Sequence, residues 1–135
     1  MMDLADRVRA VLDGVLRYEE EDDGALTVSY EHTFTSLRVV AIAEDLEMVS
    51  LTQILAWNVP LDNEFRDKVA QLTHDTVLGT VSLAEQVAGS GVADVTLRYN
   101  FPAAGLTDEA LRTLIIMVIS AGADVRETLS GDADS

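Results

Sequence analysis

The sequence feature that most constrains the fold is a long helical pattern near the C-terminus, over residues 106–129, that is apolar on more than one face. Thr107 is placed to cap its first turn. At 3.6 residues per turn, one apolar stripe comprises Leu111, Leu114, Ile115, Val118, Gly122, Val125 and Leu129. Ile116, Ile119 and Ala123 lie outside that stripe. Because a helix with two apolar faces is buried on two sides, the second face predicts either a further internal contact or a partner surface.

The remaining hydrophobic periodicity predicts two further helices and five strands. Residues 3–13, and a segment that begins at Asp62 and ends before Gly79, have the spacing of amphipathic helices. Alternating or β-branched apolar residues predict strands over residues 25–32, 36–43, 48–57, 80–86 and 92–101. The order is α-β-β-β-α-β-β-α, without strict βαβ alternation. We therefore expect an α+β fold with a mainly antiparallel five-stranded sheet.

Length and composition fit one folded domain. Of the 135 residues, 48% are hydrophobic, which is enough to bury a core. We expect the domain to span residues 1–129, with residues 130–135 as a flexible acidic tail. The N-terminus lacks the features of a signal peptide, and the longest apolar run, residues 114–119, is too short to span a membrane. A cytoplasmic location is therefore expected.

The charge of the chain argues against two classes of partner. There are 24 acidic and 9 basic residues, which give a formal net charge of −15. A nucleic-acid backbone is bound by clustered lysine and arginine, whereas Lys68 is the single lysine here and the arginines are scattered. The same negative field repels anionic lipid head groups. We predict no nucleic-acid or membrane partner. The charge either favours a basic partner or keeps the protein soluble.

The sequence contains no pattern that indicates catalysis, a cofactor or a metal site. His74 lies opposite Phe65 on the predicted helix, as a solvent-exposed histidine would, and His32 lies at a strand end. Zinc needs three or four nitrogen or sulfur ligands, which two distant histidines without cysteine do not supply. The acidic run of residues 19–23 lacks the spacing of a calcium-binding loop. We predict no catalytic, cofactor-binding or metal-binding residues.

Several short segments lie within or between the predicted helices and strands. They are Leu16-Arg17-Tyr18 with the turn Asp22-Asp23-Gly24, Trp57-Asn58-Val59-Pro60, Val95-Thr96-Leu97-Arg98-Tyr99, and Leu106-Thr107-Asp108-Glu109-Ala110-Leu111 with Ala123-Asp124. In order and spacing these segments resemble the YbjN family of bacterial proteins, also described as sensory transduction regulators, over residues 3–129. The resemblance implies a fold like that of type III secretion chaperones of the Tir-chaperone (CesT) class. It also implies a small, acidic, dimeric protein that binds another polypeptide and has no agreed enzymatic activity.

Two features are candidates for a partner surface. The patch Ile116, Ile119 and Ala123 either packs inside the domain or meets its own copy across a two-fold axis, and we favour the homodimer. Trp57, the single tryptophan, is interpreted as a core residue, with an interface anchor as the alternative. We expect a non-enzymatic, chaperone-like or regulatory module that binds a polypeptide client as a homodimer. The alternative is a small-ligand sensor with a pocket between the sheet and the C-terminal helix.

Overall fold

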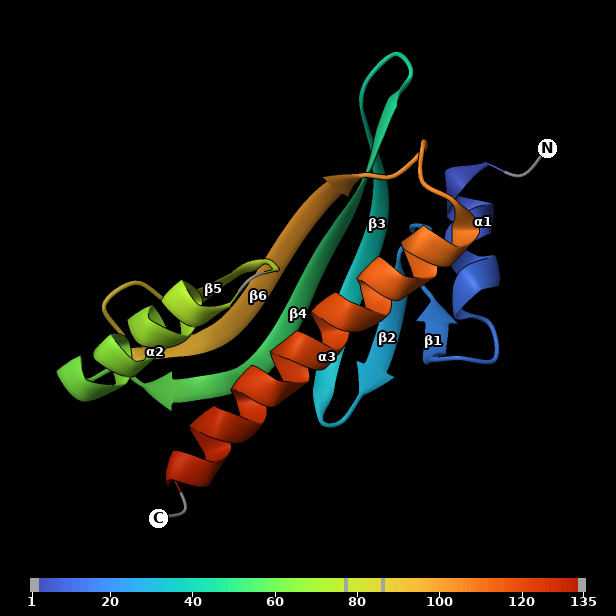
Figure 1. The fold of residues 1–135 in the computed structure, drawn as a ribbon. Helices are drawn as coiled ribbons and strands as arrows, with labels where there is room; N and C mark the ends of the chain where they lie inside the picture. The colour runs from blue at the N-terminus through green and yellow to red at the C-terminus, as the bar shows by residue number, and fades with distance from the viewer. Residues whose placement is uncertain (1–2, 77, 86, 134–135) are drawn as a thin grey trace.

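The protein folds as a sheet with helices, as a computed structural model describes for residues 3–76, 78–85 and 87–133 (Figure 1). The elements are α1 (Leu4–Leu12), β1 (Arg17–Glu20), β2 (Leu26–Tyr30), β3 (Thr33–Ala43), β4 (Leu46–Pro60), α2 (Asn63–Asp75), β5 (Thr80–Ala84), β6 (Val92–Pro102) and α3 (Asp108–Ala133). The described strands form one six-stranded sheet in the order β1-β2-β3-β4-β6-β5, and every pairing is antiparallel. The predicted α+β class is confirmed, with one strand more than predicted.

The additional strand is β1, which overlaps the acidic run of residues 19–23, where the sequence pattern predicts no strand. Residues Arg17 to Glu20 pair with Leu26 to Ser29 of β2, and Tyr18 lies opposite the fully buried Val28. Tyr18 packs against the core, whereas the other β1 side chains are exposed. The strand is therefore held by the β2 backbone and one aromatic side chain.

The helices pack against one face of the sheet and build a single core there. Figure 1 shows α3 crossing the strands diagonally, with α1 beside its N-terminal part and α2 over β5 and β6. Alternate residues of β4 face this core, namely Val49, Leu51, Gln53 and Leu55. Arg7 of α1 joins that helix to the start of α3, because its guanidinium donates to the Ala104 carbonyl (3.2 Å) and to the carboxylate of Asp108, the first residue of α3 (2.8 Å). The opposite face carries no described helix.

The predicted helix starts agree with the structure, whereas the end of α3 does not. Asp62 caps α2 by accepting a hydrogen bond from the Phe65 amide at 2.7 Å, and Thr107 caps α3 through the Ala110 amide at 3.1 Å. Helix α3 continues to Ala133, so residues 130–133 of the predicted tail are helical. Residues 134–135 of that tail lie outside the described residues.

A polar contact lies inside the core where α3 crosses β3 and β4. The Gln53 amide is fully buried, and its Nε2 donates to Thr33 Oγ1 (2.9 Å) and to the Ile119 carbonyl (3.0 Å). Gly122 lies directly against this amide, because a Cβ added there would be 1.8 Å from Gln53 Oε1. The close approach of helix and strand therefore needs a residue without a side chain at this position.

Candidate partner surfaces and binding pocket

The structure corrects the candidate interface on the C-terminal helix. Ile119 is 1% exposed and Ala123 is 5% exposed, so both belong to the core, while Ile116 is half-buried. The expectation that these residues form an outer patch was therefore wrong for Ile119 and Ala123. Helix α3 crosses β3 and β4 diagonally and also packs against α1, so it buries a broader arc than its main stripe.

Trp57 lies on the uncovered face of the sheet. It is 44% exposed, and its ring packs edge-on against Phe34, which is also 44% exposed, with 5.7 Å between ring centroids. The favoured interpretation of Trp57 as a core residue was wrong. Its orientation follows from the two register shifts of β4 between Ile54 and Val59, because each shift interrupts the alternation of core-facing and outward side chains. The backbone there is fixed by Asp94, whose carboxylate accepts a hydrogen bond from the Asn58 amide at 3.0 Å.

Further apolar side chains are exposed toward the hairpin that joins β3 and β4. They are Val40 (38%), Ile42 (61%) and Leu46 (41%). Figure 1 shows this hairpin projecting beyond the other strands of the sheet. Between the hairpin and the Trp57–Phe34 pair, the uncovered face carries mainly hydroxyl side chains, among them Ser36, Ser50 and Thr52. Two exposed apolar areas are therefore separated by a polar stretch.

A pocket of about 390 Å³ lies between α1 and the edge of the sheet. Its apolar lining comes from Ala5, Val8, Leu26, Leu37, Val39 and Val49, and its polar rim from Arg9, Asp23 and Arg38. This pocket lies beside α1, whereas the sensor alternative predicts a pocket between the sheet and the C-terminal helix. Another pocket, of about 550 Å³, lies between α3 and the C-terminal end of α2, and its apolar lining comes from Leu72, Leu78, Met117, Ala121 and Val125.

Both arginines on the pocket rim are paired with carboxylates. Arg38 Nη2 lies 2.6 Å from Asp23 Oδ2, and Asp23 also accepts a hydrogen bond from the Ala25 amide at 3.1 Å. The Ala25 amide, and then Arg38, hold the pKa of Asp23 below its ordinary value. Arg9 hydrogen-bonds to Asp6, which lowers the pKa of Asp6 and raises that of Arg9. The rim therefore offers no unpaired cation to an anionic ligand.

The β3 strand has an unpaired edge next to this pocket. Its pairing with β2 ends at Leu37, opposite Leu26, whereas its pairing with β4 continues to Ala43. In the part of the chain that the structure describes, residues 38–43 have no strand on the β2 side and no backbone hydrogen bond to that side. The amino-acid sequence does not reveal this edge, because strand patterns do not show where a neighbouring strand ends.

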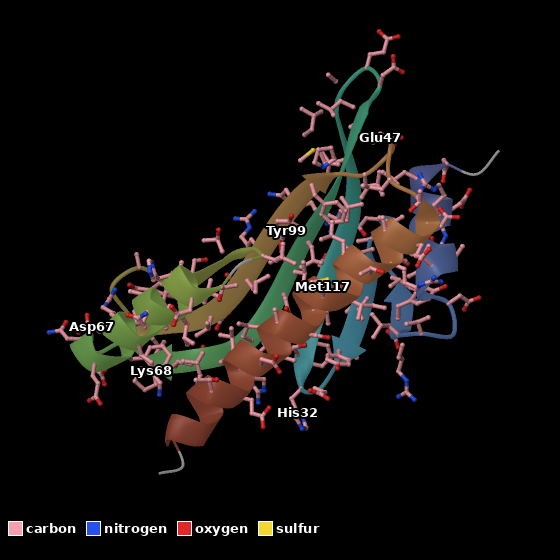
Figure 2. All side chains as sticks on the ribbon, in the orientation of Figure 1. His32, Glu47, Asp67, Lys68, Tyr99 and Met117 are labelled. Carbon is pink, nitrogen blue, oxygen red and sulfur yellow. The ribbon has the colours of Figure 1, made fainter. Side chains whose placement is uncertain are left out.

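Neither histidine lines the pocket beside α1. His74 is exposed on α2, as predicted, and Figure 2 shows His32 at the turn between β2 and β3, at the other end of the sheet from Glu47. The described residues contain no group of three or more histidine, aspartate or glutamate side chains arranged to hold a metal ion. Nor do they include a helix with the length and hydropathy needed to cross a membrane.

Comparison with solved structures finds this arrangement in YbjN, a proposed transcription regulator from E. coli. Its crystal structure matches with a TM-score of 0.68 and 12% sequence identity, over 95% of this chain and 92% of that chain. The chain has a YbjN-like fold. The resemblance inferred from the sequence is confirmed at this level. No protein-family model and no curated protein matches the sequence. Since a shared fold does not determine function, the function is argued from the surfaces described above.

Proposed function

We propose that this protein is a non-enzymatic interaction module, regulatory or chaperone-like, that forms a homodimer and binds a polypeptide through exposed apolar surface. The observation that carries the proposal is the exposed Trp57–Phe34 pair on a sheet face without helices. Tryptophan is enriched among the residues that contribute most to protein interfaces. A large aromatic side chain held rigidly by a neighbouring ring loses little conformational entropy on binding.

Self-association should depend on Trp57. We expect light scattering coupled to size-exclusion chromatography to give a dimer for the wild-type chain. Trp57→Ala should raise the dissociation constant by about 30-fold, the loss typical of an interface residue worth about 2 kcal/mol. Met117→Ala is the matched control, because Met117 is 53% exposed but lies on α3, on the other side of the sheet. A wild-type chain that is monomeric at all concentrations, or a Trp57→Ala dimer of unchanged stability, would contradict this assignment.

A small-ligand sensor is the second candidate, and the pocket beside α1 is the observation that favours it. A volume of about 390 Å³ lies within the range of ligand sites, and the lining combines apolar side chains with a few polar groups. The polar rim consists of one carboxylate, Asp23, and two arginines, all of them already in ion pairs, so small and mainly apolar uncharged compounds are the ligands that fit best. A thermal-shift screen with such compounds tests this function, because a ligand that binds only the folded protein raises the melting temperature. Unchanged melting temperatures at millimolar ligand would argue against it.

A further inference from the structure

Along the free edge of β3, the turn geometry determines which residues direct their backbone amide and carbonyl groups away from β4. Glu31 and His32, both with positive φ (44° and 67°), form the two-residue turn between Tyr30 and Thr33. In a two-residue turn with positive φ at both positions, the two flanking residues, here Tyr30 and Thr33, are hydrogen-bonded to each other through their backbones. Along two antiparallel strands, hydrogen-bonded residue pairs alternate with pairs that are not hydrogen-bonded to each other. The odd-numbered residues of β3 therefore direct their amide and carbonyl groups to the β2 side. Beyond the last β2 pair, these residues are Val39 and Ala41.

The apolar pocket continues this free edge. Val39 and Ala41 line the pocket together with Val8 of α1 and Leu26 of β2. A strand added along residues 38–43 would lie in line with β2, where the chain has turned away into the β1–β2 connection. Its alternate side chains would then enter the pocket, because successive side chains of a strand point to opposite sides of the sheet. An added strand could therefore pair with the β3 backbone and bury its apolar side chains in the pocket at the same time.

The charge around the edge favours a basic occupant. Besides Asp23, which is paired with Arg38, four acidic residues lie at its two ends, namely Asp22 in the β1–β2 turn and Glu44, Asp45 and Glu47 in the projecting hairpin. The nearby cations Arg9 and Arg38 are already paired with carboxylates. These acidic residues make it unfavourable for the same edge of a second copy to approach and pair here. A basic segment would instead be attracted to it.

We propose that the edge of β3 at residues 38–43, with the pocket beside it, binds an extended basic segment of a partner protein by strand addition. The segment alternates lysine or arginine with apolar residues and pairs with Val39 and Ala41 while its apolar side chains fill the pocket. A segment of about six residues would span residues 38–43, because residues of paired strands lie opposite one another. This proposal rests on the proposed polypeptide-binding function and names a site for it that is separate from Trp57.

The probe for this site is a fluorescein-labelled ten-residue peptide of alternating lysine and valine, measured by fluorescence anisotropy with the full chain. We expect saturable binding. The same peptide with N-methyl groups on its pairing residues should bind at least tenfold more weakly, because it lacks the donor groups of a strand. A glutamate–valine peptide should show no binding in the same concentration range. Equal affinity for the N-methylated peptide would overturn strand addition.

Ala41→Pro tests the edge itself. Proline at position 41 removes the amide that faces the free side and leaves the amides of β3 that face β4, as edge strands tolerate. We expect at least a tenfold loss of affinity for the lysine–valine peptide, with unchanged circular dichroism. Glu44→Lys with Glu47→Lys keeps the backbone intact and should also weaken binding about tenfold, with a smaller dependence on salt. Peptide binding that is unaffected in both variants would overturn the proposal.

Amide hydrogen exchange followed by NMR separates this proposal from the proposed function. We expect peptide to protect the Val39 and Ala41 amides, and Trp57→Ala to leave that protection unchanged. If these amides become protected without peptide when the protein concentration is raised, a second copy of the chain occupies the edge, and the proposal is overturned. Failure of the peptide to bind, with Trp57-dependent dimerisation intact, overturns the edge site alone. Loss of the Trp57-dependent dimer with the edge site intact contradicts only the homodimer of the proposed function.

Discussion

Ile119→Asp is expected to unfold the domain. Ile119 is 1% exposed in the core beneath α3, where an ionised carboxylate would have no basic partner. Burying an unpaired charge, together with the lost apolar contacts, should lower the free energy of unfolding by about 4 kcal/mol or more. That loss approaches the total stability of a typical domain, roughly 5–15 kcal/mol. The measurement is urea denaturation followed by circular dichroism.

The control for this experiment is Met117→Asp, two positions earlier on the same helix. Met117, labelled on α3 in Figure 2, is 53% exposed according to its accessible surface, so the same charge should change the stability by no more than about 0.5 kcal/mol. The two variants carry the same net charge and the same side chain, and they differ only in burial. An Ile119→Asp protein that unfolds at the same urea concentration as Met117→Asp would show that Ile119 lies at a surface.

Gly122→Ala should be the most damaging substitution of a small residue. In a helix, glycine to alanine normally stabilises by roughly 0.5–1 kcal/mol. Here the new Cβ would lie 1.8 Å from Gln53 Oε1 and 2.5 Å from its Cδ, so α3 and β4 must separate or the amide must move. Overpacking of this kind costs roughly 1–3 kcal/mol, and the lost Gln53 hydrogen bonds add to it. We expect a net destabilisation of about 2–3 kcal/mol in urea denaturation.

A double-mutant cycle with Gln53→Ala isolates the cause of that loss. Gln53→Ala alone removes the hydrogen bonds to Thr33 and Ile119 and leaves space beneath α3. In the double variant the Gly122→Ala methyl group enters that space, so the two losses should not add, and the coupling energy should be about 2 kcal/mol. Strictly additive losses would mean that Gly122 and Gln53 do not pack together.

The elements that were predictable are those specified by neighbouring residues. The helix caps Asp62 and Thr107 act on amides three residues away, so their signal lies within one turn of sequence. The long alternation of β6 and the apolar spacing of α1 are equally local. Strand β1 was missed because its acidic residues have low strand propensity, and it exists through its pairing with β2.

The candidate surfaces were less predictable, because they depend on tertiary arrangement. A helical wheel places Ile119 off the main stripe, but the way α3 lies across β3 and β4 decides whether that flank is buried. Trp57 faces outward because β4 shifts register on either side of Ala56, and these shifts have no clear sequence signal. The contact of Gln53 with Gly122 joins a strand and a helix far apart in the chain. Each of these features needed the three-dimensional structure.

Self-association through the uncovered sheet face can be measured by the fluorescence of Trp57, because it is the single tryptophan of the chain. Its fluorescence emission, and its quenching by acrylamide, should be recorded over a range of protein concentrations. If the uncovered face is the self-association surface, emission shifts to shorter wavelength and quenching falls as concentration rises, because the half-exposed ring becomes buried. If emission and quenching at every concentration remain those of an exposed indole, the uncovered face is not the self-association surface.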